Sequence, residues 1–300
     1  MLENLKLSPG YDGFLFLAES VRNPPVLRPH HHVELEINLV VQGTITYVAD
    51  GRRYTFGQRT LLWFFPAQEH QLVDRTPDAR YYVAVFKPAL IRRSCRGSAY
   101  AGLKRQSHPD GVLNTVLEPE SYDLMKKTMD ALMEGSLDPD ILNREAGYGY
   151  QSNFVYRHAD PDGLNAGLHH LLLLSWRSRE SGRVLSRPVA LHPCVRRALA
   201  HLAAEADPVD LPTLARACGV SPAYLSRLFA RQMGQPLSQY RNALRLGRFW
   251  EAMARPDRPT VTEAVYAAGF GSYAQFYKVY RQAYGSGPRA SVRAGVKETN

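Results

Sequence analysis

The sequence predicts an α+β chain of several domains, with a β-barrel at the N-terminus and an all-α domain containing two helix-turn-helix units at the C-terminus. Up to about residue 87, short apolar or alternating segments are separated by turn residues, which is typical of barrels and sandwiches. From about residue 121, apolar residues follow helical spacing. In the last hundred residues one helical pattern occurs twice. The 300 residues suffice for domains with separate cores.

The N-terminal part contains five segments that we expect to be strands. They cover residues 14–18, 36–41, 44–48, 61–65 and 81–86. Glycine or aspartate lies between several of them, as at Gly43, Gly51 and Gly57, and these residue types favour turns. Many short strands at this spacing predict a barrel, to which we assign residues 1–110.

Residues 111–182 are expected to be a helical segment that either forms a dimer interface or packs on the barrel of the same chain. One apolar stripe begins near Ser121 and consists of Leu124, Met125, Met129, Leu132 and Met133. A second helix is predicted over Leu164–Arg179, and residues 135–163 show no pattern that assigns them. Residues 183–192 include Pro188 and are the expected interdomain linker.

An internal repeat dominates the last domain, residues 193–300. In the first copy Leu211, Leu214, Ala215 and Cys218 form a helical face that Gly219 ends. In the second copy Val261, Ala264, Val265 and Ala268 do the same before Gly269. Each copy continues into a second helix, which buries Leu225, Leu228 and Phe229 in one case and Phe276, Val279 and Tyr280 in the other. A helix over 237–254 joins the copies, and its Arg241, Arg245 and Arg248 would hold them at a fixed separation.

Charge and cysteine content narrow the choice of partner. The net charge is +9, and residues 193–300 contain 15 Lys and Arg against 7 Asp and Glu, so that the preceding part is nearly neutral. This distribution predicts that only the last domain meets a polyanion, although a basic surface can also serve solubility. Three widely spaced cysteines fit a reducing cytoplasm. With no signal peptide or spanning apolar stretch, we expect a cytoplasmic protein without a membrane partner.

The repeat carries a family resemblance. The stretches LARACGVSPAYLSRLFARQMGQPLSQYRNALRL and TEAVYAAGFGSYAQFYKVYRQAYGSGP resemble the AraC/XylS family of bacterial transcription regulators. The chain departs from the family pattern at Ala264-Val265, where Ile-Ala is usual, and at Ser291-Val292, where Tyr-Arg is usual. The resemblance implies a sequence-specific regulator that binds double-stranded DNA, can form a homodimer and would meet RNA polymerase if it is an activator.

The same resemblance implies which side chains face DNA. Ala223, Ser226 and Arg227 would enter one major groove, and Tyr273, Ala274, Gln275 and Lys278 the next. Tyr224 and Arg231 would position the first helix on the phosphate backbone. Arg227 can form a bidentate pair with guanine and Gln275 with adenine, whereas Lys278 can equally contact a phosphate.

A second resemblance concerns the barrel. His30, His32 and Glu36 stand as HxHxxxE, and LLWFFPAQEH ends in His70, which together resemble the two motifs of the cupin barrel. Alternation along a strand places His30 and His32 on one face. The set suits a divalent transition metal. We expect no required cofactor, because hydrogen bonds can equally satisfy these histidines, and His31 and Glu34 offer alternative partners.

The barrel interior is the expected pocket for a small-molecule effector. Its predicted walls are Tyr47, Trp63, Phe65 and Tyr82, with Arg28 and Arg80 as candidates for an anionic ligand. We assign no catalytic residue and expect no enzyme. The leading hypothesis is therefore a ligand-responsive regulator. The alternatives are a constitutive DNA-binding protein whose barrel serves dimerisation, and a cupin metalloenzyme domain fused to a DNA-binding module.

Overall fold

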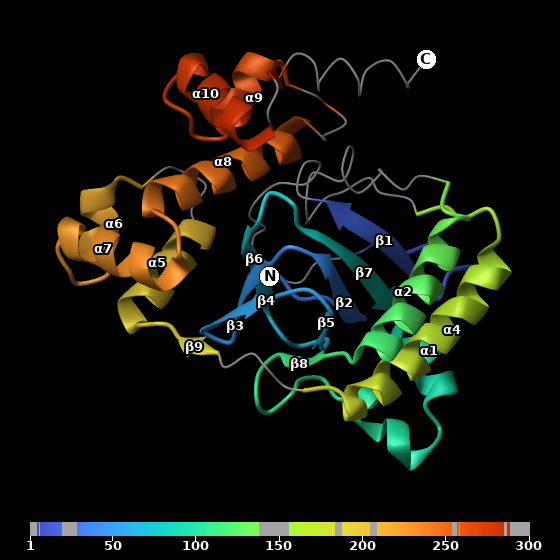
Figure 1. Cartoon of the computed structure of the whole chain (residues 1–300). Helices are drawn as coiled ribbons and strands as arrows, with labels where there is room; N and C mark the ends of the chain where they lie inside the picture. The colour runs from blue at the N-terminus through green and yellow to red at the C-terminus, as the bar shows by residue number, and fades with distance from the viewer. Residues whose placement is uncertain are drawn as a thin grey trace.

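The computed structural model confirms the predicted fold class, a barrel followed by a helical domain (Figure 1). It describes residues 5, 7–19, 29–137, 156–183, 188–204, 209–253, 257, 259–284 and 287–288. Figure 1 shows the strands in the middle of the molecule, two long helices on one side of them, and the C-terminal helices on the other side and above.

Two antiparallel sheets face each other to form the barrel. The five-stranded sheet has the order β1 (Gly13–Glu19), β7 (Arg80–Phe86), β2 (Leu35–Gln42), β5 (Thr60–Phe64) and β8 (Leu113–Val116). The four-stranded sheet has the order β6 (His70–Arg75), β3 (Ile45–Ala49), β4 (Arg52–Phe56) and β9 (Val189–Ala190). All five expected strands are present. The sequence pattern missed β4, β6 and β8 and placed β9 within the linker.

Strand register decides which side chains lie between the sheets. Glu36 on β2 is opposite Phe64 on β5 and Val85 on β7, and directly paired residues point to the same face. Ile37, next to Glu36, is opposite Trp63 and therefore points to the other face. That other face of the five-stranded sheet is covered by helices.

Helices α2 (Pro119–Met133) and α4 (Pro161–Ser178) lie side by side against this sheet (Figure 1). Met125 and Met129 of α2 are fully buried in the same core as the strands, and Leu132 and Met133 pack against it, so most of the predicted stripe lies on the barrel of its own chain, whereas Leu124 is exposed. Shorter elements near this layer are α1 (Pro88–Ser94) and the 3₁₀ helices η1 (Ser98–Lys104) and η2 (Arg179–Ser181).

The C-terminal domain contains six described helices. They are α5 (Pro193–Ala204), α6 (Leu211–Ala217), α7 (Pro222–Met233), α8 (Leu237–Met253), α9 (Val261–Ala267) and α10 (Tyr273–Tyr284). Its apolar residues form two clusters, one around α5, α6, α7 and the start of α8, the other around the end of α8, α9 and α10. The long helix α8 thus belongs to both units and joins them (Figure 1).

The expected linker is partly built into the barrel. Val189 and Ala190 pair with Arg53 and Arg52, which adds β9 to the edge of the four-stranded sheet directly before α5. The chain is therefore attached to the barrel immediately before it enters the C-terminal helical domain. Among the described helices, none is both long and apolar enough to cross a membrane.

Candidate functional site

The two helix-turn-helix units have matching turns. Gly219 and Gly269 adopt positive φ angles of 71° and 87°, a conformation that residues with a Cβ rarely adopt. After each glycine the chain folds back through an equivalent hydrogen bond, from Val220 N to the carbonyl of Ala215 (3.0 Å) and from Phe270 N to that of Val265 (3.3 Å). The predicted repeat is therefore a repeat of structure.

The second helix of each unit begins at an equivalent serine cap. The Ser221 hydroxyl accepts a hydrogen bond from Tyr224 N (3.3 Å), and the Ser272 hydroxyl accepts one from Gln275 N (3.1 Å). Both helices, α7 and α10, are 12 residues long. The first unit thus presents α7, and the second presents α10, as its recognition helix.

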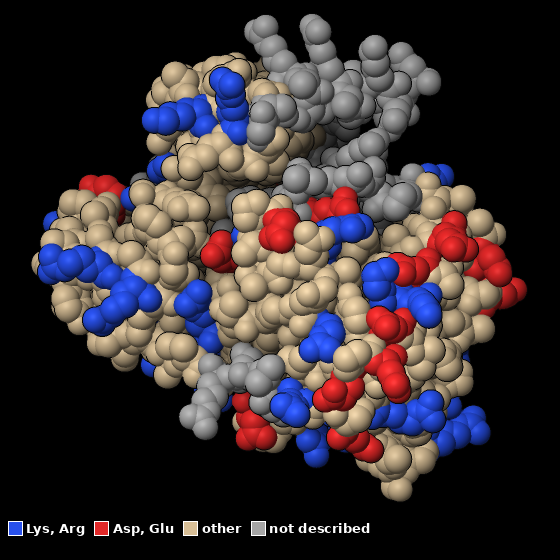
Figure 2. All heavy atoms as spheres, in the orientation of Figure 1, with Lys and Arg blue, Asp and Glu red and all other residues tan. Residues whose placement is uncertain are grey.

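The residues of α7 that were predicted to meet DNA lie on its outer face. Ala223, Tyr224, Arg227 and Arg231 are exposed and Ser226 is half-buried, whereas Leu225, Leu228 and Phe229 are buried in the first cluster. Space-filling spheres of Lys and Arg gather on this unit and on the second unit with few acidic neighbours, while the barrel surface mixes both signs (Figure 2). The exposed side chains are free to approach a polyanion.

The outer face of α10 is exposed in the same way, but one of its side chains, Gln275, already has a hydrogen-bond partner. Ala274, Gln275 and Lys278 are exposed, and Tyr273 is half-buried beside Phe276. The Gln275 side-chain oxygen accepts a hydrogen bond from Gly271 N (3.0 Å), so a bidentate pair with adenine requires Gln275 to leave this partner. The spacing Ser272-x-x-Gln275 is that of a capping box, but the glutamine oxygen bonds Gly271, one residue before the serine cap.

Of the three α8 arginines predicted to hold the two units, two contact the first unit and one contacts the second. Arg241 donates to the carbonyl of Val209, just before α6, and Arg248 donates to that of Leu202 at the end of α5 (3.3 Å). Arg245 lies 5.8 Å from the centre of the Phe270 ring in the second unit. These contacts join both units to one helix and fix the separation of their recognition helices.

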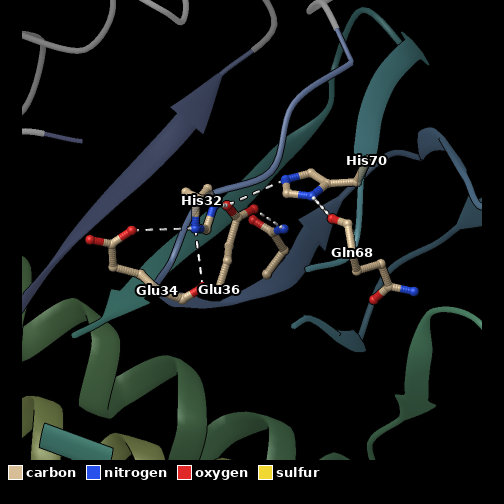
Figure 3. Close-up of polar contacts among 6 residues, drawn as sticks. His32, Glu34, Glu36, Gln68 and His70 are labelled. Atoms are coloured by element: carbon tan, nitrogen blue, oxygen red, sulfur yellow. Dashed lines mark hydrogen bonds and ion pairs between the residues drawn. The ribbon is translucent and has the colours of Figure 1, made fainter. Parts of the chain in front are cut away.

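The barrel holds a polar cluster made by His32, Glu36 and His70 (Figure 3). One potential ligand atom from each residue lies within 4.8 Å of the others, and all three side chains are buried. His32 Nε2 is 3.0 Å from Glu36 Oε2, and His70 Nε2 is 3.7 Å from the same oxygen. Glu36 comes from the five-stranded sheet and His70 from the other, so the cluster lies between the sheets.

Backbone carbonyls orient both imidazoles. His32 Nδ1 donates to the carbonyl of Glu34 (3.1 Å), and His70 Nδ1 donates to that of Gln68 (3.0 Å). Each Nε2 therefore faces the Glu36 carboxylate, whose other oxygen accepts a hydrogen bond from the Asn38 amide (2.7 Å). Two imidazole lone pairs directed at a carboxylate repel it unless a cation, either a proton on the ring or a metal ion, lies between them.

The charge state of Glu36 follows from these partners. Burial by itself raises the pKa of this carboxyl, but hydrogen bonds and positive charge from His32 and His70 together hold the pKa well below its usual range. The carboxylate is therefore a fixed negative charge inside the barrel. A cation or a hydrogen-bond donor is the chemical partner that this charge favours.

His30 does not complete the predicted four-residue set. It is buried, and its ring centre lies 4.4 Å from that of His70, but its nitrogens are not among the atoms that converge within 4.8 Å. Its backbone forms a bridge with His70 instead. Of the alternative partners, Glu34 places a carboxylate oxygen 3.6 Å from His32 Nδ1, and His31 is half-buried.

Three of the four residues proposed as pocket walls, together with Arg80, do not face this cluster. Trp63 packs edge-on against Trp176 of α4, and Tyr82 donates to Asp130 of α2. Phe65 stacks beside His108. The Arg80 side chain is exposed and forms a 3.0 Å ion pair with Glu19. Arg28 lies outside the described residues.

The interior walls come from the neighbouring positions. Phe64 stacks on His70 with ring centres 4.0 Å apart, and Tyr47, the one predicted wall that faces inward, lies 4.8 Å from Phe64. Tyr81 is hydrogen-bonded to Tyr47. The pKa of Tyr47 is raised, mainly because the side chain is buried and also because Tyr81 and Glu36 lie nearby. The prediction was thus wrong by one residue on β5 and on β7. Pairing each strand with Glu36 in register would have identified Phe64 and Tyr81.

The barrel with a buried polar cluster, joined to two capped and exposed recognition helices, defines a DNA-binding regulator with a sensor domain. Two family models agree with this class. The AraC-like ligand binding domain matches residues 16–148, and the helix-turn-helix domain matches residues 214–294, which together cover more than two thirds of the chain. The chain belongs to the AraC/XylS family.

Individual relatives are distant. Regulatory protein ada of Salmonella typhimurium is 36% identical over 78 residues, which are 26% of this chain and 22% of that protein, so the match spans about a fifth of the relative. Among solved structures, fatty-acid-bound ToxT of Vibrio cholerae is 9% identical, with a TM-score of 0.38 over 97% of this chain and 96% of that one. The AraC-like activator CuxR is 13% identical, with a TM-score of 0.31 over 85% and 78%.

Proposed function

We propose that this protein is a sequence-specific transcription regulator whose affinity for DNA responds to a small molecule bound inside the barrel. The observation that carries the proposal is the pair of equivalent recognition helices, α7 and α10, held by one helix and exposed on their outer faces. Basic side chains on both units supply affinity for phosphates, and the exposed residues near each helix start supply sequence choice.

Selection from random duplex DNA tests this proposal. The full chain is mixed with a pool of random duplexes, and the bound fragments are sequenced after several rounds. We expect a motif with two elements about one helical turn apart, because two recognition helices on one rigid helix reach successive major grooves. A single short element would show that one unit alone reads bases, and binding without any enriched motif would contradict the proposal.

The polar cluster supports a second candidate role, binding of a divalent transition metal by His32, Glu36 and His70. The donor set fits such an ion, since the Nδ1 atoms of both imidazoles donate to carbonyls and turn each Nε2 toward an ionised carboxylate. When bound, the metal would supply a positive charge that can polarise a ligand oxygen. The chain's own residues would hold and orient it.

Metal content measured by mass spectrometry on protein purified without chelator tests this role. We expect about one equivalent of metal in the natural protein and loss of most of it in Glu36→Gln, which keeps the side-chain volume. Asn114→Ala, on the inner face of β8 outside the cluster, is the control and should retain the metal. No metal above background in the natural protein would leave the histidines as purely structural groups.

The proposed partners follow from the family and the charge distribution. We propose a homodimer on DNA, contact with RNA polymerase if the output is activation, and action in the cytoplasm, where the three free cysteines Cys95, Cys194 and Cys218 stay reduced. We propose no catalytic activity for the barrel. The effector is expected to offer hydrogen-bond donors or positive charge, since Glu36 is an anion and Arg80 is engaged at the surface.

A further inference from the structure

Strand β6 has two faces with different surroundings. His70 and Leu72 point into the barrel, where His70 belongs to the polar cluster. Gln71 points the opposite way, because side chains alternate along a strand, and Val73, at the register shift that follows Leu72, also packs on this outer side. Val73 is fully buried, and its apolar neighbours belong to the cluster of the first helix-turn-helix unit rather than to the barrel. One strand therefore contributes to both the candidate ligand site and the DNA-binding domain.

Two buried hydrogen bonds fasten the first unit to this strand. The Gln71 amide donates to the Tyr240 hydroxyl of α8 (2.5 Å), and both side chains are almost fully buried. The Gln235 amide, between α7 and α8, donates to the backbone carbonyl of Val73 (2.6 Å). Breaking either bond without a replacement would leave a buried polar group unsatisfied, which is costly. We call this contact, made by Gln71 and Val73 of β6 with Tyr240 and Gln235, the dock.

The dock leaves the recognition surface open. Arg227 and Arg231 of α7 are exposed to solvent. Gln235 and Tyr240, which contact the barrel, are buried. The apolar cluster of the second unit contains no described barrel residue, so α8 is its apolar connection to the rest of the molecule. The buried hydrogen bonds between β6 and this domain reach α8 and the turn before it, and they leave the outer face of α7 exposed.

We propose that β6 transmits occupancy of the polar cluster to the DNA-binding domain through the Gln71–Tyr240 hydrogen bond. The proposal rests on the proposed function, since it names how the same site would regulate DNA binding. An occupant of the cluster fixes His70, and Gln71 shares a peptide unit with His70. A short, buried hydrogen bond tolerates little displacement, so a small shift of β6 changes the free energy of the docked arrangement.

The test is a double-mutant cycle between the two faces of the strand. Full-length protein carries His70→Ala, Tyr240→Phe or both, and amide hydrogen exchange is followed by mass spectrometry in peptides that cover residues 237–246. We expect His70→Ala alone to accelerate exchange there by about fivefold, because it loosens the strand to which α8 is docked. In the Tyr240→Phe background the same change should add clearly less, because the Gln71–Tyr240 hydrogen bond is already absent and only the Gln235–Val73 bond and the packing of Val73 still connect β6 to this domain.

Controls separate this coupling from general destabilisation. Asn114→Ala, on the inner face of β8, should leave exchange in 237–246 unchanged, and thermal unfolding verifies that each variant is folded. If His70→Ala does not fold, Leu72→Val perturbs the same inner face more gently. Equal acceleration by His70→Ala in both backgrounds, or none in either, would overturn the proposal. Because exchange is measured without DNA, a protein that shows this coupling yet selects no motif would contradict only the proposed function.

Discussion

At the scale of single residues, the barrel interior is organised around one fixed anion. Glu36 is ionised despite its burial, because His32 and His70 face it from two sides. A buried charge of this kind is tolerated only where its partners remain in place. The side chains around it, Asn38, Tyr47 and Phe64, therefore define which atoms of an occupant lie near the charge.

Arg227 is the residue for which base recognition is most directly testable. Its side chain is exposed on α7, where a guanidinium can donate two hydrogen bonds to guanine. We expect Arg227→Ala to weaken binding to the selected operator by about 1–3 kcal/mol and to relax preference at one base position. Competition titrations against single-base operator variants measure both effects. An equal loss on operator and random DNA would instead assign Arg227 to a phosphate.

Residue orientation was the part of the site that the sequence predicted least well. Trp63 and Phe64 are both aromatic and adjacent, as are Tyr81 and Tyr82, so hydropathy does not say which member of each pair points inward. In this protein both faces of the five-stranded sheet are buried, one by the second sheet and one by α2 and α4. Alternation of polar and apolar residues, the usual indicator, is therefore absent.

At the scale of elements, the turn glycine of the first unit gives a clear stability prediction. Gly219 has a φ of +71° with open space around its Cβ position, so Gly219→Ala suffers backbone strain alone and should destabilise the protein by about 1–2 kcal/mol. Gly247, inside α8 and equally open, is the matched control, and Gly247→Ala should stabilise by about 0.5–1 kcal/mol. Urea denaturation of both variants checks the signs, and a neutral Gly219→Ala would contradict the assigned turn.

The start of α9 should make stability depend on pH. Thr260 and Glu263 form a capping box, and hydrogen bonds from the Thr260 backbone and hydroxyl lower the pKa of Glu263. A carboxyl with a lowered folded-state pKa stabilises the fold above its unfolded pKa, and this contribution disappears as the pH falls through the folded pKa. We expect Glu263→Ala to lower Tm at pH 7 and to lower it less as the pH approaches 3. A Tm difference independent of pH would exclude the carboxylate as its source.

Elements were predictable where local chemistry marks them. The repeated helix, glycine turn and serine cap identified α6, α7, α9 and α10, because each signal acts within a few residues. Strands β4 and β6 were missed since both contain charged or amide residues, such as Arg53 and Gln71, on their outer faces. Those residues are accommodated by contacts with other elements, and the local pattern contains no information about them.

At the scale of the whole molecule, the chain folds its barrel and its helix-turn-helix units as separate parts, and strand β6 is one of the places where the two parts are in buried contact. The nearly neutral part folds as the barrel and its helices, and the basic part folds as two units on α8. The composition predicted this division. The dock between β6 and α8 was not predictable, because Gln71 and Tyr240 are 169 residues apart in the sequence and neither residue type marks an interface.

This division predicts how DNA affinity depends on salt. Removing one cation that neutralises a phosphate should reduce the slope of log K against log salt concentration by about 0.9. We therefore expect Arg231→Gln and Lys278→Gln each to lower the slope by about one, since both side chains are exposed on the recognition helices. Arg92→Gln, which removes an exposed cation from α1 of the barrel domain, is the matched control and should leave the slope unchanged. Titrations on the selected operator between about 50 and 200 mM salt measure the three slopes. A reduced slope for Arg92→Gln would show that DNA also contacts the barrel domain. DNA binding would then involve both parts of the chain, contrary to the prediction from their charges.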